Sequence, residues 1–523
     1  MSSRSKTLPE SVAALAPAFV SGHSPANGRH SNNGNGTRQL RVMKFGGTSV
    51  ADAASIERVI EIIRVAVQET NLVVVVSAMS GVTNKLIEAG TQSEAGNCAA
   101  VEAIFEELRV QHETAVGTLI HSPSERERLS AHVQTLFEEI RQLCEGTMLI
   151  RELTARANDS IASLGERLSA PLMAAALSER GIMSEAVEAT ELVVTDSYHG
   201  HAEPKMEATS ERCNTRLLPL LKNGCVPVVT GFIGVSETGV RTTLGRGGSD
   251  YSATILGAAL RTDEVIIWKD VDGLQSADPL LVAGARTIPE ISYREAAELA
   301  FFGAKVLHPK TLDTVMQRGI PLWIRNTFAP ERPGTKITAL GAITGDGVKA
   351  LTAVGDIGLI TIGRTLGIPD IFGRTIAVTS ALRVDVLLSS QSSPQNEICL
   401  VVSSSVAQRT IEALRREFAR DMGEKNGEHI LLDSGVALIT IVGQKVRHSS
   451  GIIERTFAAL GRENIRTAAI AHSSSECNIS FLVAKKDMQK ALLTIHREFH
   501  LSGAGLASAP TAACSISAPL PAA

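Results

Sequence analysis

Aromatic residues are scarce in this 523-residue chain, at 3% of the composition, and neither sign of charge is in strong excess. The 51 lysines and arginines against 55 acidic residues give a formal net charge of -4. Proteins that bind nucleic acid need a basic surface and commonly use aromatic rings on which bases stack. We therefore expect no nucleic-acid partner.

Cysteine is also sparse, and long apolar runs are lacking. The seven cysteines (98, 144, 213, 225, 399, 477 and 514) show no CxxC or CxxH spacing, which argues against a structural zinc site or a disulfide framework. No apolar run reaches the roughly 18 residues of a membrane-spanning helix. We expect no metal site built by the chain, no membrane role and a cytoplasmic location.

The length suits two or three domains with cores of their own. Residues 1–40 are rich in Ser, Asn and Gly, and residues 503–523 in Ala, Ser and Pro, so both predict disordered ends. An organelle transit peptide is the less favoured interpretation of the N-terminal extension, because Ser and Arg are frequent there and Glu10 is its only acid.

Between these ends, apolar strands alternate with amphipathic segments. "RVMKF", "NLVVVVSAM", "CVPVVTGFIG" and "EVIIWKDVDG" are short runs rich in β-branched residues, separated by helical patterns such as "AVEAIFEELRVQHETAVGTLI". Alternation of this kind predicts an α/β fold with a mostly parallel sheet covered by helices on both faces. Such sheets bind ligands at the carboxyl ends of their strands.

The first polar cluster stands at such a strand end. Lys44 ends an apolar strand, Gly46 and Gly47 follow, and a helix is expected to start near Asp52. Glycines let backbone N–H groups approach an anion, while the helix N-terminus and the lysine add positive charge, so the pattern predicts a phosphate site. The alternative is a lysine whose stem covers apolar surface. A P-loop is excluded, because its lysine follows the glycines.

The second cluster is "TTLGRGGSDYSAT", which begins at Thr242. Arg246 lies among three glycines, and Ser249 and Asp250 open an alanine-rich helix. An arginine in this frame suits bidentate binding of a carboxylate or phosphate. A helix N-cap at Ser249 or Asp250 is the alternative, but a cap requires neither the glycines nor the arginine.

Two further stretches are weaker by themselves. In "WKDVDGLQSADP", Lys269 and Asp270 follow a strand, and a tight Asp-Gly turn is the alternative. An EF-hand is excluded because no glutamate stands at the required place. In "AFFGAKVLHP", Lys305 follows a helix that begins near Tyr293.

Together these stretches resemble the aspartate kinases (aspartokinases) of the amino-acid kinase family. "KFGGTSV", "VVSAMSGVTNKL", "SLGERLSA", "VVTGFIG", "TTLGRGGSDYSAT", "WKDVDG", "ADP" and "FGAKVLHP" occur in the family's order between Val42 and about Ile337. The resemblance implies a carbamate kinase-like catalytic domain over 41–338. It also implies an ATP-dependent transfer to the side-chain carboxylate of L-aspartate, with Mg²⁺ bound as MgATP. The product, 4-phospho-L-aspartate, would open lysine, threonine and methionine biosynthesis.

The resemblance also implies residue roles. Lys44 would stabilise the transferred phosphoryl group and Asp250 would orient this lysine or the metal-bound phosphate. Glu166 would take the α-ammonium of aspartate and Arg246 its α-carboxylate. The substrate would be held by Thr48, Glu166, Arg246, Gly247, Gly248 and Ser249, and the nucleotide by Lys44, Gly46, Gly47, Lys269, Asp270, Gln275 and Lys305. Without the resemblance, Glu166 would be interpreted as a charge on a helix surface.

Two departures from the family pattern concern the nucleotide. Gln275 and Leu280 occupy places where many relatives have an aromatic residue and the arginine of "DPR". These changes affect adenine stacking and one phosphate contact. Lys269 stands where many bacterial relatives have threonine, and "WKDVDG" is more similar to the plant and fungal branch.

Beyond residue 337 an internal repeat appears. "GLITI" at Gly358 recurs as "ALITI" at Ala437, and "QSSPQNEICLVV" at Gln391 recurs as "HSSSECNISFLV" at His472. Each copy resembles the βαββαβ ACT domain, with copies expected at 350–425 and 430–502 and the second possibly inserted into the first. By resemblance, ACT pairs imply feedback inhibition by lysine or threonine, a homodimer or higher homo-oligomer, and candidate effector contacts at Gln391, Ser392 and Asn396.

Two alternatives to aspartate kinase activity stay open. One is a catalytically silent subunit that senses amino acids, although such a subunit would be free to lose the charged residues of the four clusters. The other is a kinase of glutamate or another small acidic amino acid, because phosphate capture alone does not distinguish the acceptor.

Overall fold

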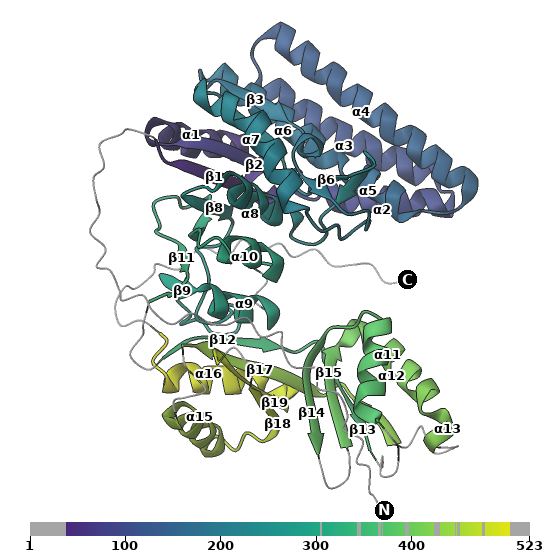
Figure 1. The fold of residues 1–523 in the computed structure, drawn as a ribbon, viewed down its shortest axis with the longest axis vertical. Coiled ribbons are helices and arrows are strands. Elements are labelled where there is room, and N and C mark those ends of the chain that lie inside the picture. Colours follow the sequence, from purple (N-terminus) through teal and green to yellow (C-terminus); the bar gives the residue numbers. More distant parts are fainter. Residues whose placement is uncertain are drawn as a thin grey trace, which may run out of the picture. The chain divides into compact units, whose positions relative to one another are not determined.

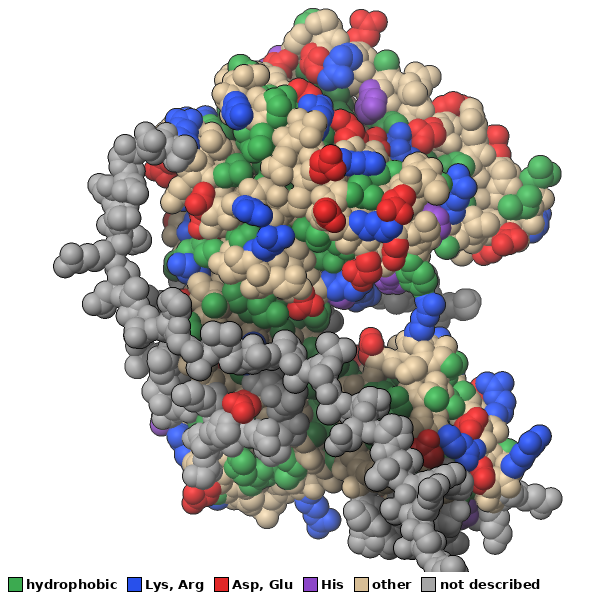
Figure 2. Space-filling model, in the orientation of Figure 1, with side chains coloured by type: hydrophobic (Ala, Val, Ile, Leu, Met, Phe, Trp, Pro, Cys, Tyr) green, Lys and Arg blue, Asp and Glu red, His purple; other side chains and the backbone are tan. Residues whose placement is uncertain are grey.

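The computed structural model describes residues 38–303, 306–342, 347–363, 368, 370–392, 397–422, 429–444, 446, 450–472 and 476–502. The predicted extension, except for its last residues, and the predicted tail lie outside these ranges, as do Lys305 and Asn396. No helix within the ranges combines the length and apolar character needed to cross a membrane. Acidic and basic side chains are interspersed on the face shown in Figure 2.

A mostly parallel eight-stranded sheet forms the centre of the N-terminal part, as expected from the alternating pattern. Its strand order is β3-β5-β2-β1-β8-β10-β11-β9, and among these neighbours β10 and β11 alone pair antiparallel. In that order the strands are β3 (Ser184–Val187), β5 (Val226–Thr230), β2 (Asn71–Val76), β1 (Leu40–Phe45), β8 (Glu264–Lys269), β10 (Leu322–Asn326), β11 (Thr335–Thr338) and β9 (Glu290–Ser292).

Two apolar cores flank this sheet, because successive strand residues face opposite sides. Phe45 and Val76 pack into one core and Val42 and Val75 into the other. The first core is shared with α1 (Ala53–Glu69), α2 (Val82–Ala95), α3 (Cys98–Leu119), α4 (Pro123–Ile150), α5 (Ala155–Ala162) and α6 (Leu164–Glu179). The second is shared with α7 (Met206–Lys222), α8 (Gly248–Leu260), α9 (Tyr293–Phe301) and α10 (Pro309–Met316) (Figure 1).

Short elements connect these layers near the strand ends. A 3-10 helix, η1 (Gly47–Val50), follows β1 directly, and η2 (Ala189–Glu191) follows β3. A small sheet of three strands has the order β4-β6-β7, formed by β4 (Val194–Thr195), β6 (Ile233–Ser236) and β7 (Arg241–Thr243).

The C-terminal part contains two four-stranded antiparallel sheets, and the elements of the first have the expected βαββαβ order. One has the order β14-β15-β13-β16 and the other β12-β17-β19-β18. The first unit consists of β13 (Ile357–Ile362), α11 (Ile371–Ala381), β14 (Val386–Ser392), β15 (Glu397–Ser403), α12 (Ser404–Glu417), α13 (Ala419–Met422) and β16 (Ile430–Asp433). The second consists of β12 (Val348–Val354), β17 (Val436–Gly443), α15 (Ser450–Arg462), β18 (Thr467–His472), β19 (Asn478–Ala484), η5 (Lys485–Asp487) and α16 (Met488–Glu498).

The connection between these units differs from the expected one. β12 precedes the whole first unit in the sequence but pairs with β17 of the second. β16, which falls within the range expected for the second copy, pairs with β13 of the first. The first unit is therefore inserted into the second, the reverse of the suggested insertion, because β12 supplies the edge strand of a sheet whose other strands follow residue 435.

Candidate active site

Three charged side chains meet where β1 and β8 end. Lys44 is on the same strand face as Val42, so it points toward α8, and Lys269 points to that side from the neighbouring strand. Lys44 Nζ lies 2.6 Å from Asp250 Oδ1, and Lys269 Nζ lies 2.8 Å from Asp250 Oδ2. A single carboxylate from the first turn of α8 thus binds both lysines.

Burial and mutual attraction set the charges of this cluster. Burial lowers the pKa of Lys44, and the charge of Asp250 partly opposes that fall. Burial acts to raise the pKa of Asp250, but the charges of Lys44 and Lys269 outweigh it, so this pKa is lowered overall. With both lysines protonated, the cluster carries a net positive charge suited to an anionic ligand.

Two helix N-termini begin beside these charges. The structure places Gly247 at the N-cap of α8 with φ +72°, in the left-handed region that favours glycine. Ser249 and Asp250 lie in the first turn, so neither is the cap that the alternative interpretation assigned to them. At η1, a Cβ added to Gly47 would stand 3.0 Å from the carbonyl oxygen of Ala78. Glycine at both positions lets backbone N–H groups approach an anionic ligand closely at the positive N-terminal ends of η1 and α8.

Glu166 and Arg246 provide opposite charges for a small zwitterion. Glu166 lies in the first turn of α6 and is 2% exposed, so it is not the surface charge expected from the residue pattern alone. Burial raises its pKa to about 8, and its Oε2 has no hydrogen-bond partner among the described residues. Arg246 is exposed, and its guanidinium forms no hydrogen bond or ion pair within the described ranges.

One cavity of about 710 Å³ brings the predicted residues together. It extends from the ends of β1 and β8 to the glycine-rich loop before α8. The predicted residues that line it are Lys44, Gly46, Gly47, Thr48, Glu166, Arg246, Gly247, Gly248, Ser249, Asp250, Lys269 and Asp270. Residues separated by more than 200 positions in the sequence therefore share one site, and the size fits a small ligand.

Other predicted contacts are not in this cavity. Gln275 does not line it, and its amide instead donates a hydrogen bond to Thr287 Oγ1 at 3.0 Å. Leu280 is 90% exposed. Lys305 and Asn396 lie outside the described residues, as does the side chain of Ser392, while Gln391 is exposed near the end of β14. The nucleotide and effector roles of these residues remain predictions.

Several cavity residues carried no prediction. The polar ones are Ser77, Ser80, Thr83, Asn84, Asn158, His201 and Thr243. The strand-end rule could have found Ser77, which directly follows β2. No comparable signal marks Asn158 or His201, whose segments reach the cavity only through tertiary packing.

Comparison with known proteins shows the family. The Amino acid kinase family profile matches residues 39–326, and the ACT domain profile matches 439–499. Aspartokinase 1, chloroplastic, of Arabidopsis thaliana is 33% identical over 470 residues, which cover 88% of this chain and 80% of that protein. The chain belongs to the aspartokinase family. Aspartate kinase, the enzyme class expected from the sequence, is thereby confirmed.

Two solved structures of E. coli aspartokinase III show the same fold at 28% identity. The complex with aspartate and ADP, described as the R-state, has a TM-score of 0.74 and matches 88% of this chain and 100% of that one. The T-state complex with lysine and aspartate has a TM-score of 0.72, with 88% and 99% coverage. The expected fold class, a kinase domain with ACT-type antiparallel sheets, is confirmed for this aspartokinase-family chain.

Proposed function

We propose that this cavity transfers the γ-phosphoryl group of MgATP to the side-chain carboxylate of L-aspartate and releases 4-phospho-L-aspartate and ADP. The central observation is that Asp250 binds Lys44 and Lys269 beside the N-termini of η1 and α8. That arrangement concentrates positive charge where polyphosphate would bind. The aspartate and ADP bound by E. coli aspartokinase III support the same pair of ligands.

Glu166 and Arg246, which carry opposite charges, are proposed to bind L-aspartate, the acceptor of the phosphoryl group. In the proposal, ionised Glu166 binds the α-ammonium and Arg246 the α-carboxylate, which leaves the side-chain carboxylate to attack. With an ordinary pKa of about 4 this nucleophile is already ionised at neutral pH and needs no general base. A carboxylate oxygen then bonds to the γ-phosphorus while the bond to the bridging oxygen of ADP breaks. Alignment of these atoms is the main contribution of the site.

The phosphoryl side requires charge neutralisation. Lys44 faces the transferred group, and Asp250 holds this lysine and Lys269 in place. Mg²⁺ is proposed as part of the MgATP substrate, where it would supply further positive charge. No group of three or more potential metal-ligating side chains occurs in the described part of the chain. Asp270 contributes a carboxylate to the cavity wall.

Replacement of Lys44 tests this assignment. We expect Lys44→Ala to lower kcat at least ~100-fold, because the lost cation acts where charge develops during transfer. Lys269 still pairs with Asp250 in this variant, so the fold should remain intact. Rates would be measured by hydroxamate trapping of the acyl phosphate, with circular dichroism as the folding check. Lys222→Ala, at an exposed position in α7, is the matched control; an unchanged rate in the Lys44 variant would refute the role.

Regulation and assembly are proposed through the C-terminal units. The two four-stranded antiparallel sheets and the ACT domain match support feedback inhibition by an amino acid, with lysine and threonine as candidates and Gln391 as a described candidate contact. Lysine is bound by the T-state E. coli structure. Pairing of ACT units between chains is the proposed basis of a homodimer or higher homo-oligomer.

The proposed compartment is the cytoplasm. Chloroplast import is the alternative, since a matched Arabidopsis relative is named chloroplastic. The proposed biosynthetic role, entry to lysine, threonine and methionine, follows from the product.

A further inference from the structure

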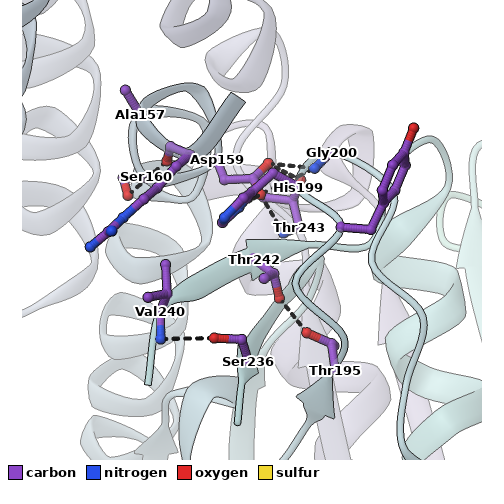
Figure 3. A network of polar contacts seen from close by, with 12 residues as sticks. Ala157, Asp159, Ser160, Thr195, His199, Gly200, Ser236, Val240, Thr242 and Thr243 are labelled. Atoms are coloured by element: carbon purple, nitrogen blue, oxygen red, sulfur yellow. Dashed lines mark hydrogen bonds and ion pairs between the residues drawn. The ribbon is translucent and has the colours of Figure 1, made fainter. Parts of the chain in front are cut away.

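One buried carboxylate holds together two segments of the cavity wall. Asp159, in α5, accepts hydrogen bonds from Thr243 Oγ1 at 2.5 Å and from Thr243 N at 3.2 Å (Figure 3). It also accepts from Gly200 N at 3.0 Å and from His199 Nδ1 at 2.8 Å. The donors come from the end of β7 and from the loop over residues 196–204, so three separate parts of the chain converge on this side chain.

Asp159 is buried, and hydrogen-bond donors surround its carboxylate. The residue is 1% exposed, and no lysine or arginine of the described chain forms an ion pair with it. A buried carboxylate without such a partner is costly unless donors surround it, and the loss of a donor weakens this compensation. Thr243, Gly200 and His199 together supply those donors, so the position of each is coupled to that of Asp159.

The two segments bound by Asp159 adjoin the glycine-rich loop that carries Arg246. Thr243 and Gly200 line the cavity, and His201 does so as well. Arg246 follows Thr243 by three positions, after Gly245 at φ +80°. A Cβ added to Gly245 would stand 2.5 Å from His201 Nδ1, which shows that the 196–204 loop and the glycine turn are in direct contact. Displacement of either segment would therefore move the arginine.

Asp159 is also close in the sequence to Glu166, the proposed ligand of the α-ammonium. Asp159 belongs to α5, and α6 begins two residues after that helix ends, with Glu166 in its first turn. The hydrogen bonds of Asp159 thus connect α5, the helix that directly precedes α6, to the end of β7 at Thr243. Glu166 lies in α6, and Arg246 follows β7. These hydrogen bonds fix the separation between the proposed ammonium-binding carboxylate and the proposed carboxylate-binding guanidinium.

We propose that Asp159 is a positioning residue that holds Glu166 and Arg246 at the spacing required by the backbone of the amino-acid acceptor. The proposal rests on the proposed function. Asp159 itself does not line the cavity, so it acts through Thr243, Gly200 and His199 without touching the substrate. Lys44, Asp250 and Lys269 form no hydrogen bond or ion pair with Asp159, and nucleotide binding is therefore expected to be independent of it.

The test compares Asp159→Asn with the wild-type chain. The amide has one acceptor oxygen in place of two and directs its NH₂ group at other donors, so we expect the KM for L-aspartate to rise at least ~10-fold. The KM for ATP should stay within about twofold, and kcat should fall less than the aspartate affinity. Calorimetric titration with L-aspartate and with ADP gives the same comparison without turnover. Asp263→Asn, which alters an exposed carboxylate bound to the N–H of Leu40, is the matched control.

A second variant guards against misfolding of the first. His199→Ala removes one donor and, like Asp159, lies outside the cavity lining; we expect a ~3-fold rise in the aspartate KM. The two changes should be non-additive when combined, because they belong to one network. Equal losses for aspartate and ATP, or an aspartate KM within twofold of wild type in both variants, would overturn the proposal. Acyl-phosphate formation from L-aspartate and MgATP by the wild-type chain tests the proposed function separately from the role of Asp159.

Discussion

At the scale of single residues, the pKa of Glu166 controls when the acceptor site carries its negative charge. Burial raises this pKa to about 8 in the ligand-free site. The carboxyl is mostly protonated below that pH and binds an α-ammonium poorly, whereas the ionised form above it binds well. We expect kcat/KM for L-aspartate to rise between pH 6.5 and 8.5, with an apparent pKa near 8.

The pH profile of Glu166→Gln checks this interpretation. The amide cannot ionise, so its kcat/KM should be low and should lose the rise near pH 8, while the wild-type profile keeps it. The KM for ATP should not follow the same curve. A wild-type profile that is flat across this interval would contradict the proposed role of Glu166.

Residues at strand ends were the ones that the sequence identified best. Lys44 and Lys269 lie at the carboxyl ends of apolar strands, and in a parallel sheet these ends meet at one edge. Asp159 was missed because its partners are a loop and a strand end 40 to 84 positions away, and no local pattern records their convergence. Glu166 depended on the family resemblance, since without it this residue would be interpreted as a charge on a helix surface.

At the scale of elements, a buried ion pair connects α9 to β12. Lys349 Nζ lies 2.7 Å from Glu295 Oε2, and the side chains are 1% and 0% exposed. The same Glu295 oxygen accepts from the N–H and hydroxyl of Ser292 in the capping box of α9. The pair therefore links the start of a kinase-domain helix to the edge strand of the second C-terminal unit.

Removal of one partner should destabilise the fold. Lys349→Met leaves the Glu295 carboxylate buried without its cation, and we expect a loss of about 3–5 kcal/mol in the free energy of unfolding. The measurement is urea denaturation followed by circular dichroism. Lys485→Met, which breaks an exposed pair with Asp356, should change stability by less than about 1 kcal/mol. Similar effects of both changes would contradict the account of the buried pair.

Element types were easier to predict than their connection. The repeated "LITI" strands indicated two units, and both are present as β13 and β17. An insertion was suggested, but which unit is inserted could not be predicted, because the sequence of β12 is largely apolar and suits pairing with many strands. Its partner is set by the sheet edge available after folding, and that edge belongs to β17, more than 80 residues later.

At the scale of the whole molecule, the catalytic part and the second C-terminal unit share polar contacts. Ser276 Oγ lies 3.0 Å from His496 Nε2, and Asn478 donates a hydrogen bond to Glu298. With the pair of Lys349 and Glu295, these contacts connect the segment after β8 and α9 to β12, β19 and α16 of the second C-terminal unit.

The most direct measurement of the central claim is acyl-phosphate formation by the wild-type chain. Hydroxamate trapping with MgATP would compare L-aspartate with L-glutamate, and would be repeated with lysine, threonine and both together. We predict aspartate-dependent product, little product from glutamate, and suppression by at least one of these additions. Well-folded protein that forms no product from aspartate would contradict the account and favour an amino-acid-sensing subunit, while equal product from glutamate would contradict the assigned acceptor.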